Sequence, residues 1–161
     1  MNLYLNIKPI LKNGNNWIIV SDYSTDNTFS ILNEISSIEK NITVFHLDKN
    51  YVPHYASFFG IKNAKTELVY LLDSDDLLYK DDLTDFIEFA FINRSYDYYY
   101  DPTKSIKCRT EFLNSTNITT SQIVEINKPT DFIFHEFPNQ SSLIIRKKFY
   151  IDNYQQSRPR K

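Results

Sequence analysis

Glycine is scarce in this sequence, since only two of its 161 residues are glycine. Loops that hold phosphate groups against successive glycines are therefore not expected. Cys108 is the single cysteine, so no disulfide bond can form within the chain. The sequence shows neither a signal peptide nor an apolar run long enough to cross a membrane. These absences favour a reducing compartment, and we expect a cytoplasmic protein without a membrane segment.

A surplus of positive charge is also absent, because the formal net charge is -2. Bulk attraction to nucleic acid is therefore not expected. Core-forming residues, by contrast, are plentiful: 42% of the residues are hydrophobic and 16% are aromatic, which argues against a disordered chain. The length fits one domain. We expect a single domain over residues 1–161, with a solvated basic tail at residues 157–161.

The spacing of apolar residues predicts alternating helices and strands up to residue 100. Helices are expected near residues 3–11, 29–38, 56–64 and 81–90, and strands at residues 17–20, 43–47, 67–72 and 96–100. Such alternation is typical of an α/β fold with a mostly parallel central sheet and helices on both faces. The later pattern is less regular and predicts a strand at 122–126, a helical turn at 130–134, a strand at 143–145 and a last helix.

Two acidic turns follow two of the predicted strands. Asp22 comes soon after residues 17–20, and Asp73, Asp75 and Asp76 come directly after the apolar run that ends at Leu72. In open α/β sheets, ligands bind at the carboxyl ends of the strands, so we expect these carboxylates to converge at one edge. In extended chain, residues two apart lie about 6–7 Å from each other and point the same way. Asp73 and Asp75 could therefore face one cation, although a polar turn that caps the next helix explains the same spacing.

Acids placed in this way would suit a nucleotide diphosphate. One carboxylate would contact the base or ribose, and the others would hold a divalent cation. Mg²⁺ and Mn²⁺ prefer hard oxygen ligands and often share them with substrate phosphates. Such a metal would neutralise the charge that develops on a diphosphate leaving group.

Three segments, in this order, resemble the family 2 glycosyltransferases of the GT-A fold: residues 20–28, 60–64 and 71–77. The family pattern is an acidic pair before Gly-Ser-Thr-Asp-x-Thr, and later an apolar strand that ends in Asp-x-Asp-Asp. Residues 139–147 are similar to a later strand on the acceptor side. The resemblance covers about residues 3–150. It implies transfer of a sugar from a nucleotide-diphosphate sugar, with a UDP-sugar favoured, to an acceptor hydroxyl.

The resemblance also implies roles for individual acids. Asp22 matches the acid that contacts the nucleotide base, and Asp73 matches the first acid of the Asp-x-Asp motif, near the ribose and diphosphate. Asp75 matches the acid that binds Mn²⁺ or Mg²⁺, and Asp76, its neighbour, is a possible second acid.

The sequence departs from the family pattern around its first acidic motif. Ser21 stands where the family has the first acid of its pair, and Tyr23 stands where it has glycine. Residues 56–60 match the family's Ala-Arg-Asn-x-Gly without the arginine and the asparagine. These changes affect the side of the fold that would hold the nucleotide.

Two further parts of the family pattern are not found. The strand that opens the family fold would precede Leu3, and the sequence begins at Met1 without it. Inverting members carry a catalytic aspartate beyond the segment that matches residues 146–150, where it deprotonates the acceptor hydroxyl. Asp152 is too close to the preceding strand for that role, and Glu136 lies before it. We therefore expect a shortened domain whose catalytic base is unknown.

Other interpretations stay open. A degenerate, inactive domain of the same fold would only bind a partner or a sugar. A phosphatase of the haloacid dehalogenase type is disfavoured, because strands precede the Asp-x-Asp motif and Leu77 follows it. A missing strand would expose a sheet edge, which a homodimer would cover. The basic run at residues 146–148 is predicted to be a solvated helix start, with a contact to the diphosphate as the alternative.

Overall fold

A computed structural model describes residues 2–11, 14–51, 53–76, 78, 80–100 and 143–156. The strand predicted at 122–126, the helical turn at 130–134, Cys108, Glu136 and the tail at 157–161 lie outside these residues. The chain divides into two compact units, Met1–Val69 with Ile145–Lys161, and Tyr70–Ile144. Each unit is described by itself, although the boundary falls within two strands.

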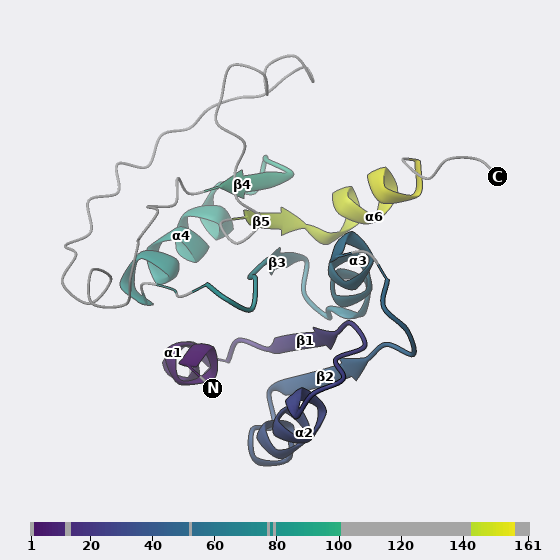
Figure 1. The fold of residues 1–161 in the computed structure, drawn as a ribbon. Helices are drawn as coiled ribbons and strands as arrows, with labels where there is room; N and C mark the ends of the chain where they lie inside the picture. The colour runs from purple at the N-terminus through teal and green to yellow at the C-terminus, as the bar shows by residue number, and fades with distance from the viewer. Residues whose placement is uncertain are drawn as a thin grey trace. The chain divides into compact units, whose positions relative to one another are not determined.

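The first unit is built on a parallel pair of strands. β1 (Trp17–Ser21) pairs with β2 (Ile42–His46), with Trp17 opposite Ile42 and Ser21 opposite His46. The chain crosses from one strand to the other through α2 (Thr28–Ile38), as a parallel connection requires. Figure 1 shows the two strands side by side, with α2 next to β2. The predicted strand–helix–strand order is confirmed.

Three more helices complete the first unit. They are α1 (Asn2–Leu11), α3 (Pro53–Asn63) and α6 (Lys147–Gln156). α3 packs on β1 and on α6 (Figure 1). It begins at Pro53, earlier than the predicted residue 56, because proline suits the first turn of a helix. The buried apolar side chains of this unit are Ile7, Ile10, Leu11, Ile35, Ile42, Phe58, Ile61, Ala64 and Ile145.

A second sheet has the strand order β3-β5-β4. Its strands are β3 (Leu68–Tyr70), β4 (Tyr98–Tyr100) and β5 (Leu143–Arg146). The amide of Leu71 donates to the carbonyl of Leu143 at 2.9 Å, and the amide of Lys147 donates to that of Glu67 at 2.8 Å. Residue numbers fall on one strand as they rise on the other, so β3 and β5 are antiparallel. Antiparallel strands of this kind are common in otherwise parallel α/β sheets.

In the second unit, α4 (Lys80–Ile92) packs its aromatic face on the strands. The ring of Phe86 meets that of Tyr70 edge to face, with centroids 6.5 Å apart, and Phe89 meets Tyr99 in the same way at 6.4 Å. Leu83 and Ala90 are buried. This confirms the helix predicted after residue 80.

The strand predicted at residues 67–72 is shorter than expected, since β3 ends at Tyr70. The apolar runs at 17–20 and 67–72 also predict strands buried on both faces, but residues 17–20 and 68–70 are only half-buried. An apolar run predicts that a strand is buried, but it does not specify which strands and helices will cover it. Among the described residues β1 pairs with β2 alone, so one edge of β1 has no strand beside it there. Within the described residues, each helix is too short or too polar to pass through a membrane.

Candidate functional site

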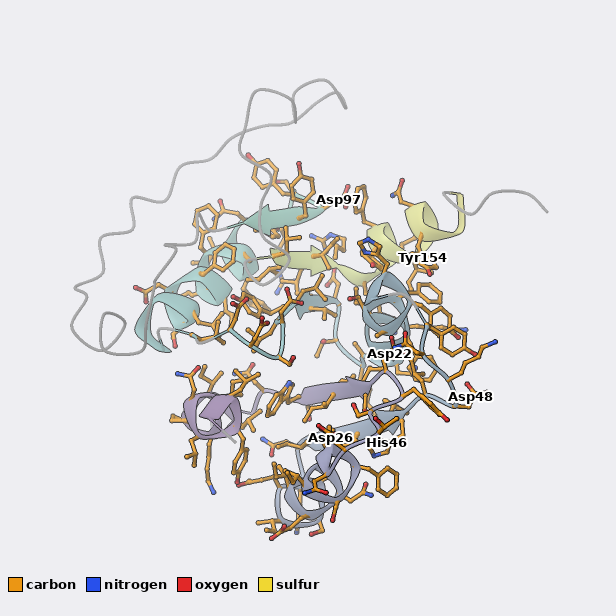
Figure 2. The ribbon with its side chains drawn as sticks, in the orientation of Figure 1. Asp22, Asp26, His46, Asp48, Asp97 and Tyr154 are labelled. Atoms are coloured by element: carbon orange, nitrogen blue, oxygen red, sulfur yellow. The ribbon has the colours of Figure 1, made fainter. Side chains whose placement is uncertain are left out.

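Asp22 lies immediately after β1 and is half-buried. Its Oδ1 accepts a hydrogen bond from the main-chain amide of Tyr51, with a nitrogen–oxygen distance of 2.7 Å. Tyr51 lies in the loop that follows β2. Because β1 and β2 are parallel, both loops leave the sheet at its carboxyl edge, where ligands bind in α/β folds. Figure 2 shows Asp22 at this end of β1, with Asp48 on the neighbouring loop.

The turn around Asp22 is held by its own side chains. Ser21 is buried, and its hydroxyl bonds to that of Ser24 at 3.0 Å. Tyr23 has a φ of 59°, in the left-handed region that glycine adopts without strain. Tyr23 occupies the place of the glycine in the family pattern, so the backbone keeps a glycine-like shape although the residue has changed.

Asp26 has a structural role at the start of α2. Its Oδ1 accepts a hydrogen bond from the amide of Thr28, two residues on, at 3.0 Å, which forms an Asx turn just before the helix. The hydrogen bonds from Thr28 lower the pKa of the Asp26 carboxyl below its ordinary value, because they favour the charged form. Asp22 and Asp26 thus each have one carboxylate oxygen held by a main-chain amide.

Several contacts surround the Tyr51 side chain. Its ring stacks on that of Tyr55 with centroids 4.3 Å apart, and the ammonium of Lys49 lies 4.9 Å from the ring centre. The hydroxyl donates to Oδ1 of Asp48 at 3.2 Å. Burial, followed by the bond to Asp48, raises the pKa of the Tyr51 hydroxyl. The sequence gives no sign of the role of Tyr51, because a main-chain donor leaves no signal in the residue type.

The second acidic motif forms a turn in the second unit. The amide of Asp76 bonds to the carbonyl of Asp73 at 3.3 Å. The extended geometry predicted for Asp73 and Asp75 was therefore wrong, because the chain closes on itself over these four residues. Asp73 and Asp76 are half-buried, whereas Asp75 is exposed.

No group of three or more His, Cys, Asp or Glu side chains suited to a metal is formed among the described residues. Mg²⁺ and Mn²⁺ do not require one, because they keep several waters and often take one or two carboxylates together with substrate phosphates. The carboxylates of Asp73 and Asp75, carried on one turn, fit such a site. Asp22 belongs to the first unit and Asp75 to the second. Their convergence stays a prediction.

The basic run at residues 146–148 is engaged in structural contacts. Arg146 forms an ion pair with Glu67, and the ammonium of Lys147 donates to the carbonyl of Ala64 at 2.6 Å. The expectation of a solvated helix start was thus wrong for Lys147 and holds for exposed Lys148. The ammonium of Lys148 lies 2.8 Å from the carboxylate of Asp152, one turn along α6. These partners leave little support for a contact with a diphosphate.

Comparison with known proteins gives the family. The model described as glycosyl transferase family 2 matches residues 7–152. An uncharacterized glycosyltransferase of Rickettsia felis is 47% identical over 64 residues, which are 40% of this chain and 10% of that protein. An uncharacterized glycosyltransferase of Haemophilus influenzae is 32% identical over 76 residues, 47% of this chain and 30% of that protein.

A third relative is the putative teichuronic acid biosynthesis glycosyltransferase TuaG of Bacillus subtilis. It is 39% identical over 72 residues, which are 45% of this chain and 29% of that protein. The matched segments therefore span less than a third of the length of these relatives. The family model, however, covers most of the chain. This chain belongs to glycosyl transferase family 2, and its alternation of helices and strands is that family's GT-A fold.

Proposed function

We propose that this chain binds a nucleotide-diphosphate sugar, a UDP-sugar before others, and passes its sugar to an acceptor hydroxyl. Membership of the family supports sugar transfer in general. The observation that carries the proposal for the donor is the contact at Asp22. Its carboxylate stands at the carboxyl edge of the β1–β2 pair, with one oxygen held by the amide of Tyr51.

A UDP-sugar is favoured because uracil offers a hydrogen-bond donor to the carboxylate of Asp22. An ionised carboxylate only accepts hydrogen bonds. The N3–H of uracil is a donor on the edge of the base, so it complements Asp22. The second oxygen of Asp22 would take this bond while the first stays on Tyr51.

Asp73 and Asp75 would hold Mn²⁺ or Mg²⁺, with Asp76 as a further acid. The metal, when bound, neutralises the negative charge of the diphosphate that leaves. The half-buried Asp73 would lie nearer the ribose and diphosphate, and the exposed Asp75 would contact the metal. Both acids belong to the same four-residue turn, which the hydrogen bond between Asp73 and Asp76 closes.

Calorimetric titration with UDP, with and without Mn²⁺, tests the proposal. We expect binding that requires Mn²⁺ and that is lost in Asp75→Ala. Asp85→Ala is the matched control, because Asp85 is an exposed carboxylate on α4 and should leave binding unchanged. Binding without metal, or no binding at all, would contradict the proposal.

A second candidate is a domain that keeps the fold and binds a sugar or a partner without transferring anything. Phe58 supports it, since it takes the place of the asparagine in the family pattern. Its side chain is buried and stacks on Tyr154 with ring centroids 4.0 Å apart, so this position now serves packing. Release of free sugar or a glycosylated product from UDP-sugars by the purified chain, lost in Asp75→Ala, would exclude this candidate.

A further inference from the structure

The loop between β2 and α3 is attached to Asp22 through Tyr51. The amide of Tyr51 donates to Oδ1 of Asp22 at 2.7 Å, which is a short bond to a charged acceptor. The two residues are 29 positions apart in the sequence. The bond therefore ties the loop after β2 to the loop after β1.

The side chain of Tyr51 makes contacts with residues on both sides of it in the sequence. Its ring packs on the ring of Tyr55, which lies in the first turn of α3. This helix therefore contacts one face of the Tyr51 ring. Lys49 lies over the ring, and Asp48 accepts the bond from the hydroxyl. A residue fixed by contacts from both ends of its loop keeps its main-chain N–H aimed in one direction.

We propose that Tyr51 is a positioning residue, whose main-chain N–H orients the Asp22 carboxylate for the donor and whose ring keeps that N–H in place. This inference rests on the proposed function. A carboxylate that is free to rotate presents its oxygens in many directions, and ordering it on binding costs free energy. With Oδ1 held by the amide, Oδ2 is already directed, and the donor does not have to order it.

Three variants distinguish the effect of the Tyr51 main-chain N–H from the effect of its side chain. Tyr51→Pro removes the N–H, Tyr51→Ala keeps the N–H and removes the ring, and Tyr51→Phe keeps both and removes only the bond to Asp48. We expect the Kd for UDP in the presence of Mn²⁺ to rise about tenfold or more in Tyr51→Pro, since the bond is made to a charged group. The rise should be smaller in Tyr51→Ala and within about threefold in Tyr51→Phe, because those variants keep the donor.

A readout that a merely structural role would not change is the ratio of the affinities for UDP and CDP. Tyr51→Pro should lower this ratio, because a disordered carboxylate distinguishes the bases less well. Local damage to the loop would weaken both nucleotides equally. An unchanged UDP affinity in folded Tyr51→Pro, or an unchanged ratio, would overturn the inference. Failure of the wild-type chain to bind UDP would instead contradict the proposed function.

A second measurement uses the wild-type loop and tests the inference even where Tyr51→Pro does not fold. We expect the Tyr51 amide to exchange slowly with deuterium in the wild-type chain and faster in Asp22→Ala. Asp22→Asn retains an oxygen that accepts the bond and should restore slow exchange. Fast exchange of this amide in the folded wild-type chain, or no change in Asp22→Ala, would overturn the inference.

Discussion

Gly60 on α3 lies directly against Val20 on β1, the strand that leads to Asp22. A Cβ atom added to Gly60 would stand 3.3 Å from Cγ2 of Val20 and 4.0 Å from Cγ2 of Ile18. The helix can approach the strand this closely because glycine has no side chain. The position of α3 on the sheet therefore depends on Gly60.

A large side chain at Gly60 should separate α3 from β1. We expect Gly60→Leu to lower the free energy of unfolding by about 1–3 kcal/mol, the usual cost of overpacking. Gly60→Ala should change it by less than about 1 kcal/mol, because the gain in helix propensity offsets the tight contact. Urea unfolding measures both. Lys62→Leu adds the same side chain at an exposed position of α3 and should have little effect. Equal losses in Gly60→Leu and Lys62→Leu would contradict this account.

Tyr23 is expected to reduce stability through its backbone. Its φ of 59° costs a residue with a Cβ atom about 1–2 kcal/mol. Tyr23→Gly removes that cost but makes the unfolded chain more flexible, so we expect a net gain of about 1 kcal/mol or less in unfolding free energy. Tyr23→Ala keeps the Cβ atom and should bring no such gain. If alanine stabilised the chain as much as glycine, strain would not be the cause.

Lys147 is expected to stabilise the end of α3. Its ammonium bonds to the carbonyl of Ala64 at 2.6 Å, just beyond the last helical residue, where a positive charge also complements the helix dipole. Lys147→Met should therefore lower the free energy of unfolding by about 1–2 kcal/mol. Lys148→Met is the matched control, because its ion pair with Asp152 is exposed and worth little. Similar losses in the two variants would argue against a specific role for Lys147.

The sequence predicted the elements of the first unit well because their signals are local. Apolar spacing located α1, α2 and both parallel strands, and it needed no knowledge of distant residues. Apolar spacing failed to predict features that depend on contacts with residues far away in the sequence. The length of β3 depends on pairing with β5, and the contacts of Lys147 depend on where α3 ends.

The candidate site shows the same limit. The residue types and their order were enough to predict Asp22, Asp73 and Asp75 as candidate ligand-binding residues. The bond that fixes Asp22 comes from a main-chain amide, which every residue except proline has, so no sequence pattern could identify Tyr51. Turn formation at Asp73 likewise depends on φ and ψ angles that an Asp-Ser-Asp-Asp sequence leaves open.

The turn between Asp26 and Thr28, which leads into α2, should give stability that depends on pH. The folded-state pKa of Asp26 is lowered from 3.8, so the charged carboxylate favours the folded state. Its contribution is present above the unfolded-state value and is lost as the pH falls through the lower, folded-state value. We expect Asp26→Ala to lower the melting temperature at pH 7, and the difference from the wild-type chain to shrink below about pH 3.8. Glu34→Ala, at an exposed position of the same helix, should show no such pH dependence.

If Oδ2 of Asp22 accepts a hydrogen bond from the base, the chain should bind UDP more tightly than CDP. Uracil presents N3–H to the carboxylate, whereas cytosine has a lone pair at N3, which the negative oxygen repels. We expect UDP to bind about tenfold more tightly than CDP in the presence of Mn²⁺, the size of effect that one charged hydrogen bond gives. Calorimetric titration with each nucleotide measures this ratio.

The control for this preference is a neutral side chain of the same shape. In Asp22→Asn the oxygen stays on the amide of Tyr51 and the NH2 group faces the base. This group donates to the lone pair of cytosine N3 and not to uracil N3–H, so the ratio of the two affinities should fall to one or below. Asp26→Asn removes a charge from the same turn while it keeps an oxygen for the amide of Thr28, so the ratio should stay as in the wild-type chain. A preference for UDP that survives in Asp22→Asn would mean that another group selects the base. In that case the contact between Asp22 and Tyr51 would serve only to join the two loops.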